Sequence, residues 1–192
     1  MTVKLYMPVP FDRFKQEGEM IGRMVIEYGD LEWDLCLLVS HVMQDIDIAV
    51  KTLYRSRDEA LRIDMADGLI RHRINPKVKQ MYETTLAHMR VCLALRSRYA
   101  HANWVDAAPD KLCFIDTNEL ANDSNPIDPN NLPLYHLDMR IIKDQARFFK
   151  EIMQNMRYLN MEVQYLLGLA DLTGFHYVRN ILRPKMAARL EA

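Results

Sequence analysis

Apolar residues recur along much of the chain at the three- and four-residue spacing of amphipathic helices. Such stripes cover residues 11–28 and 31–46, and the intervening Tyr-Gly-Asp at 28–30 predicts a break or kink between two helices. Ser56 and Glu59 have the spacing of a capping box, so a further helix is expected to open there. The first third of the chain therefore predicts three helices.

Two longer helices are expected further along the chain. Asn75 suits an N-cap and Pro76 suits the first helical position, so one helix is predicted from Pro76 to about His101. The last long stripe covers about 137–167, and Gly168 after it suits a C-terminal turn. These helices supply most of the expected apolar core.

The segment at 105–136 breaks the helical pattern. It holds four prolines and several asparagines, which indicates a long irregular loop, with a short strand at 111–115. We therefore predict an all-α fold, a bundle of four to five helices with a long irregular loop before the last long helix. The expected layout is an N-terminal extension at 1–10, one helical bundle domain at 11–168, and a short C-terminal helix with a basic tail at 169–192.

Composition and charge narrow the classes of protein. At 192 residues, 49% hydrophobic and 27% charged, the chain is long enough for one ordinary globular domain. The net charge of -1 gives no global attraction to nucleic acid or to membrane. No apolar run is long enough for a membrane span, and the three scattered cysteines look like reduced core residues, so a cytoplasmic protein is expected.

Arg96 lies where a solvent-exposed arginine is not expected. At about 100° per residue it projects onto the middle of the apolar stripe of the helix at 76–101. A guanidinium stays charged, so burial would require a partner. Glu32, at the flank of an earlier apolar stripe, is a candidate, and one interpretation of Arg96 is a purely structural bridge to Glu32.

His101 falls on a different face of the same predicted helix. Five residues of ideal helix place it about 140° away from Arg96, on the side of Ser97. The two side chains can meet only if the helix ends between them, or if a second copy of the chain brings its own pair across a two-fold axis.

This pair also carries a resemblance. An Arg, four intervening residues and a His, in "RSRYAHANW" near the end of a long helix, resemble the HEPN superfamily (higher eukaryote and prokaryote nucleotide-binding domains). The order of elements over about 11–168 is similar as well. The resemblance implies a dimeric helical bundle that cuts RNA without a metal and leaves a cyclic phosphate. Under it, His101 is the general base or acid on the ribose 2′-hydroxyl, and Arg96 stabilises charge on the phosphorane.

Supporting positions surround the motif, and some depart from the family pattern. Ser97 stands where active members usually carry Asn, Asp or His, and Asn103 stands where members that a partner nucleotidyltransferase modifies carry Tyr. Arg98 and Tyr99 complete the set of supporting residues. No metal-ligand spacing occurs, so neither a metal nor a cofactor is expected.

Two functions remain open from the sequence. The first is a HEPN-like, metal-independent RNA-binding protein or endoribonuclease that acts as a homodimer. The second is a catalytically silent helical module for dimerisation or for a protein partner, with Arg96 held by Glu32. A locally basic segment at 55–79 can be read either as a track for an RNA backbone or as an ordinary solvated surface, because Asp58, Glu59, Asp64 and Asp67 are interspersed in it.

Overall fold

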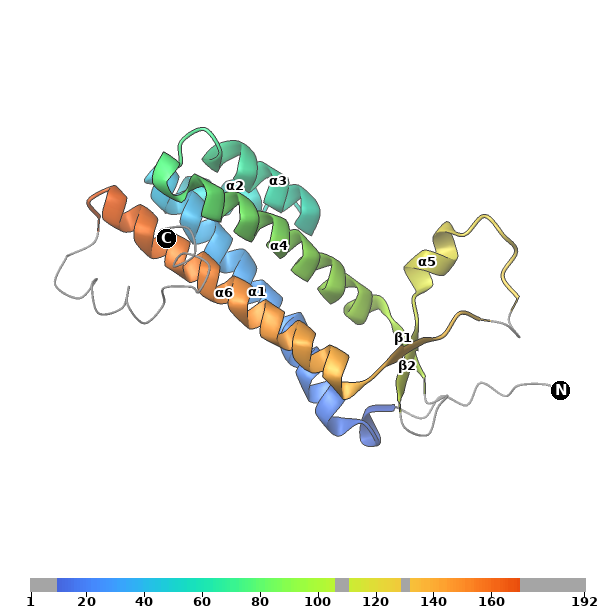
Figure 1. Cartoon of the computed structure of the whole chain (residues 1–192). Coiled ribbons are helices and arrows are strands. Elements are labelled where there is room, and N and C mark those ends of the chain that lie inside the picture. The colour runs from blue at the N-terminus through green and yellow to red at the C-terminus, as the bar shows by residue number, and fades with distance from the viewer. Residues whose placement is uncertain (1–9, 106–110, 129–131, 170–192) are drawn as a thin grey trace. The chain divides into compact units, whose positions relative to one another are not determined.

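The structure, a computed structural model, describes residues 10–105, 111–128 and 132–169. Over these residues the chain is mostly helical, with six α-helices and a small three-stranded sheet before the last long helix (Figure 1). The predicted helical fold class is confirmed. The predicted extension and basic tail fall almost entirely on 1–9 and 170–192, outside the described residues.

The elements follow one another in a simple order. A 3-10 turn at Pro10–Asp12 precedes the helices, which are α1 (Lys15–Met43), α2 (Ile46–Leu53), α3 (Glu59–Ile70), α4 (Pro76–His101), α5 (Thr117–Asn122) and α6 (Met139–Leu166). The strands are β1 (Asn103–Val105), β2 (Leu112–Ile115) and β3 (Tyr135–Leu137).

The chain divides into two compact units. The single helical bundle domain predicted over 11–168 stays a prediction. The first unit comprises 1–26 and 94–148, and the second comprises 27–93 and 149–192. The helices α1, α4 and α6 each contribute residues to both units. None of the helices in the described ranges has the length and apolar content that a membrane crossing needs.

The first unit contains the sheet and α5. Its strands are antiparallel in the order β1-β2-β3, with Trp104 opposite Phe114 and Cys113 opposite His136. All four residues of β2 are buried, as expected for the central strand. The short strand predicted at 111–115 is thus confirmed, whereas β1, β3 and α5 occupy a segment for which only a loop is indicated.

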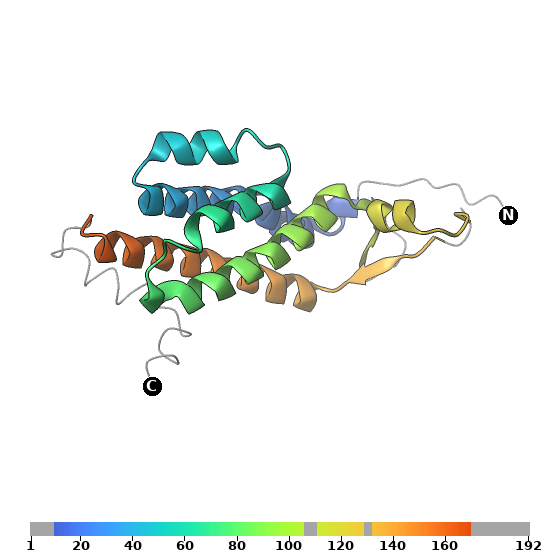
Figure 2. The ribbon, with the colours of Figure 1, turned by 90° about the horizontal axis from the view of Figure 1, so that it is seen from above.

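The second unit is a bundle of helical segments. Figures 1 and 2 show α2 and α3 side by side and running in opposite directions. Its core is apolar and comes from α1, α2, α3, α4 and α6. The most deeply buried side chains include Leu31, Leu35, Leu38, Ile63, Ile70, Tyr82, Leu86, Met89, Phe149, Met156 and Leu159.

The predicted break at 28–30 is wrong, because α1 runs unbroken through it. A glycine in an exposed helix position costs only about 1 kcal/mol relative to alanine. Tyr28 and Leu31, on either side of Gly29, are both buried and anchor the helix. The real end of α1 lies at Met43, where Gln44 adopts a positive φ of 56° and Asp45 caps α2.

The predicted capping box is also wrong by two residues. Asp58 is the N-cap of α3, and its carboxylate accepts hydrogen bonds from the backbone N–H groups of Ala60 and Leu61. The Ser56 hydroxyl instead accepts from the Asp58 backbone N–H, 3.1 Å away. A short carboxylate is among the best N-cap groups, so it takes the role here.

The ends of the two long helices after residue 75 agree with the sequence signals. The Asn75 side chain accepts from the Lys77 N–H at the start of α4. Gly168 follows α6 with a φ of 69°, and its N–H and that of Leu169 bond back to Tyr165 and Gln164. This is the Schellman arrangement, which only glycine adopts without strain.

Asp67 on α3 ties that helix to α4 and gives a pH-dependent prediction. Burial favours its neutral form, but hydrogen bonds from Arg71 and from the Tyr82 hydroxyl, at 2.6 and 2.8 Å, hold the pKa of Asp67 below its ordinary value of 3.8. A lowered folded-state pKa stabilises the protein above the unfolded value, and this contribution is lost as pH falls through the folded value.

We expect Asp67→Asn to lower the free energy of unfolding by about 1 to 3 kcal/mol at pH 7. The difference from wild type should shrink as the pH falls below about 3.8, because the unfolded wild-type chain then binds a proton at Asp67 that the folded chain does not yet bind. Urea unfolding between pH 7 and pH 3 measures this, with the exposed Asp12→Asn as a control. A difference that stays constant over this range contradicts the prediction.

Candidate functional site

The sequence-predicted pair lies at the end of α4, and α4 is continuous from Pro76 to His101. The helix does not end between Arg96 and His101, which keeps these side chains on faces about 140° apart. One of the two routes by which they could meet is therefore excluded. The other, a second copy of the chain across a two-fold axis, stays a prediction.

The two residues also differ in exposure. Arg96 is half-buried, whereas His101 is exposed at the last residue of the helix. The backbone carbonyl of His101 accepts a hydrogen bond from the Thr117 hydroxyl, 3.1 Å away, at the start of α5. The end of α4 is thus fixed against α5, and the imidazole is left accessible to solvent.

Glu32 belongs to the second unit, where it has a different partner from the one proposed. Its carboxylate accepts from the Arg62 Nε at 2.7 Å, and both side chains are only about one-tenth exposed, at 11% and 12%. A bridge from Arg96 to Glu32 stays a prediction. Arg62 is not indicated as the partner by the sequence, because its place on α3 depends on how α1 and α3 pack.

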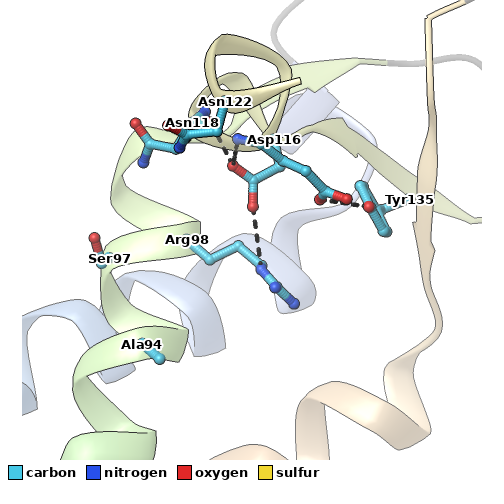
Figure 3. A pocket seen from close by; sticks show the side chains of 8 residues that line it. Ala94, Ser97, Arg98, Asp116, Asn118, Asn122 and Tyr135 are labelled. Carbon is cyan, nitrogen blue, oxygen red and sulfur yellow. Dashed lines mark hydrogen bonds and ion pairs between the residues drawn. The ribbon is translucent and has the colours of Figure 1, made fainter. Parts of the chain in front are cut away.

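A polar pocket of about 440 Å³ opens beside the last two turns of α4, within the first unit (Figure 3). It is lined by residues of α4, by residues of and just before α5, and by β3. The lining residues are Ala94, Ser97, Arg98, Asp116, Asn118, Glu119, Asn122 and Tyr135. Ser97 and Arg98 are thus brought together with residues of the segment for which a loop is predicted.

Asp116 organises one wall of the pocket. One carboxylate oxygen accepts from the backbone N–H groups of Asn118 and Glu119 and so caps α5. The other oxygen lies 3.2 Å from the Nε of Arg98 (Figure 3). Asp116 is buried and Arg98 is half-exposed. Their ion pair joins α4 to the start of α5 and orients the arginine.

A second pair of lining residues, Tyr135 and Glu119, is also hydrogen-bonded. The Tyr135 hydroxyl donates a hydrogen bond to Glu119 (Figure 3). This bond to a carboxylate raises the pKa of Tyr135. The Tyr135 ring stacks on the buried Phe114, with centroids 5.2 Å apart, so the tyrosine is held from both its ring and its hydroxyl.

The helical spacing puts His101 on the same face of α4 as two of the residues that line this pocket. Ala94, Ser97 and His101 are three and four residues apart, the separation that puts side chains on one face of a helix. Ala94 and Ser97 line the pocket. The imidazole therefore continues the pocket-lining face by one turn, toward the end of α4.

The remaining supporting residues have plainer roles. Tyr99 is buried, its hydroxyl donates to Gln145, and its ring packs against Trp104 with centroids 5.7 Å apart. It therefore supports the site as a core residue. Asn103 is exposed on β1.

Two of the basic side chains in the segment at 55–79 are paired with carboxylates. Arg62 binds Glu32, and Arg71 binds Asp67 and Glu83. These pairs lower part of the positive charge available to a polyanion. Both interpretations of 55–79, a track for an RNA backbone and a solvated surface, stay predictions.

The structure adds candidate functional residues that the sequence analysis did not identify. Asp116, Glu119 and Tyr135 form the pocket wall, yet they lie in the segment interpreted as irregular. A signal exists in the sequence, since Asp116 follows a buried strand and precedes Glu119 by three residues, the pattern of a helix start. Cross-strand pairing is harder to foresee, and it places the buried Cys113 sulfur 3.2 Å from Nδ1 of His136.

Within 10–105, 111–128 and 132–169, no three His, Cys, Asp or Glu side chains gather as a metal site. The three cysteines are buried and unbonded to one another, as their apolar sequence surroundings indicate.

Comparison with known proteins adds no relative. No protein-family model, curated protein or solved structure matches this chain. The pocket, the end of α4 and the motif that lies there are the features of this chain that point to a function.

Proposed function

We propose that this chain is a HEPN-like, metal-independent endoribonuclease that binds and cuts RNA as a homodimer. The observation that carries the proposal is the exposed His101 at the last residue of α4, on the helix face that lines a polar pocket. Histidine is a common general acid and base, because an imidazole can both accept and donate a proton in a cleavage reaction.

The reaction uses the 2′-hydroxyl of the RNA itself. His101 accepts the 2′-hydroxyl proton as this oxygen attacks the adjacent phosphorus. The bond from phosphorus to the 5′-oxygen of the next nucleotide then breaks, that oxygen takes a proton from a water molecule, and the imidazolium of His101 returns its proton to solvent. The products are a 2′,3′-cyclic phosphate and a 5′-hydroxyl, with no change in oxidation state.

Arg96 supplies charge to the transition state. The phosphorane carries more negative charge on its oxygens than the starting diester, and a guanidinium presents forked donors to two of them. Because Arg96 and His101 of one chain lie on different helix faces, the proposal requires two copies to complete the cleft.

The test is cleavage of a mixed single-stranded RNA pool in EDTA. We expect wild-type protein to release fragments with cyclic phosphate ends, and His101→Ala to lower the rate by about 100-fold or more, the usual contribution of a general acid or base. His72→Ala serves as the matched control, because His72 is also exposed but lies in the second unit. Mass spectrometry of the fragment ends identifies the chemistry.

The outcomes are distinct. Equal cleavage by wild type and His101→Ala, or cleavage that EDTA abolishes, overturns the proposed chemistry. No cleavage by any of the three proteins favours the alternative, a silent helical interaction module. One observation supports that alternative, since Trp33 and Tyr54 in the second unit are 44% and 40% exposed with ring centroids 6.4 Å apart, and aromatic residues are enriched at protein interfaces.

A further inference from the structure

We infer that the pocket beside His101 binds an RNA base, and that guanine is the base it selects. This inference rests on the proposed function, because it names the substrate group that the same site would hold next to the bond it cuts. It is carried by the charge, the hydrogen-bonding groups and the aromatic wall of the pocket.

Charge decides between a base and a phosphate. Arg98 contributes one positive charge to the lining, while Asp116 and Glu119 contribute two negative ones. The arginine is moreover paired with Asp116 at 3.2 Å. A phosphate would therefore meet net repulsion, whereas a neutral base would not.

An aromatic wall provides the stacking surface. Tyr135 lines the pocket, and the buried Phe114 holds its ring by stacking at 5.2 Å with an interplanar angle of 24°. A ring held in this way loses little entropy when a ligand packs on it. Stacking on an aromatic side chain is a common way for proteins to bind unpaired bases.

The hydrogen-bonding groups select the kind of base. Glu119 presents a carboxylate, of which Oε2 accepts from Tyr135. The Asn122 amide nitrogen donates to the Asn118 backbone carbonyl at 2.8 Å, and its amide oxygen is a further acceptor among the lining side chains. The acceptors of Glu119 and Asn122 suit a base with several N–H donors. Guanine offers N1–H and an adjacent amino group on one edge, whereas uracil offers a single N–H.

The position of the pocket fits one nucleotide. Ser97 lines the pocket and His101 lies four residues further along α4, a rise of about 6 Å. A base in the pocket and its own 3′-phosphate beside His101 can belong to the same residue of RNA. Cleavage is therefore expected on the 3′ side of guanine.

The experiment combines binding and cleavage with the full chain. Equilibrium dialysis measures binding of guanosine 3′-monophosphate and uridine 3′-monophosphate. We expect wild type to bind the guanosine nucleotide about tenfold more tightly, and Glu119→Gln to remove that preference by losing a charge-assisted hydrogen bond. Glu151→Gln, an exposed glutamate of α6 in the second unit, is the control.

Sequencing of the cleaved RNA ends provides the second readout. Wild-type cuts should concentrate after guanine, and Glu119→Gln should distribute them over all bases. Cleavage without base preference, together with equal binding of the two nucleotides, overturns the inference and leaves the nuclease proposal standing. Guanosine preference that Glu119→Gln abolishes, without any RNA cleavage, sustains the pocket and overturns the nuclease. If the wild-type protein shows neither a nucleotide preference nor RNA cleavage, the pocket inference and the nuclease proposal are both overturned.

Discussion

Replacing Arg62 with alanine is expected to lower the free energy of unfolding by about 3 to 5 kcal/mol. The guanidinium donates to Glu32 at 2.7 Å and to the Ser56 carbonyl at 2.8 Å. It also lies over the Tyr54 ring, 5.5 Å from its centroid. Without Arg62, the Glu32 carboxylate would remain in a site where the residue is only 8% exposed. Stranding a buried charge costs much more than an exposed ion pair contributes.

Chemical denaturation of Arg62→Ala, Glu32→Ala and the double variant measures this effect. The double variant should be less destabilised than the sum of the single ones, because it leaves neither charge unpaired. Arg57→Ala is the control, since Arg57 is an exposed arginine of the same α2 to α3 connection. A loss below about 1 kcal/mol for Arg62→Ala would show that the pair behaves like a surface ion pair.

Two helix ends agree with their sequence signals. Asn75 with Pro76 marks the start of α4, and Gly168 marks the end of α6, because each signal acts through backbone groups within a few residues. The same locality explains the failures. Gly29 carries an intrinsic helix penalty, but buried residues on both sides outweigh it, and that burial depends on contacts with other helices.

Only part of the candidate site could be predicted from the sequence. Arg96 and His101 stand out because a charge on an apolar stripe and a spaced pair are patterns along one helix. The pocket beside them depends on Asp116, Glu119 and Tyr135, which meet α4 through the turn into α5 and the pairing of β2 with β3. Likewise, Glu32 has Arg62 as a partner across 30 residues of sequence. Such pairings follow from tertiary packing, which helical periodicity does not encode.

Mixing two inactive variants is expected to restore RNA cleavage. Alone, Arg96→Ala and His101→Ala should each lower the rate by about 100-fold or more, because one removes transition-state charge stabilisation and the other removes a proton acceptor. A mixed dimer keeps one arginine and one histidine in its cleft. After subunit exchange the mixture should therefore cut RNA faster than either variant by itself.

The mixing test depends on the geometry of α4. Within one chain an unbroken helix keeps Arg96 and His101 about 140° apart, so the proposed cleft has to draw them from two copies. If the mixture stays as slow as its components, although differently tagged chains co-purify, the shared cleft is wrong. Arg96 is half-buried, so Arg96→Lys is tested in parallel. Lysine keeps the charge and most of the packing but loses the forked donors, and it should also be slow alone and regain activity in the mixture.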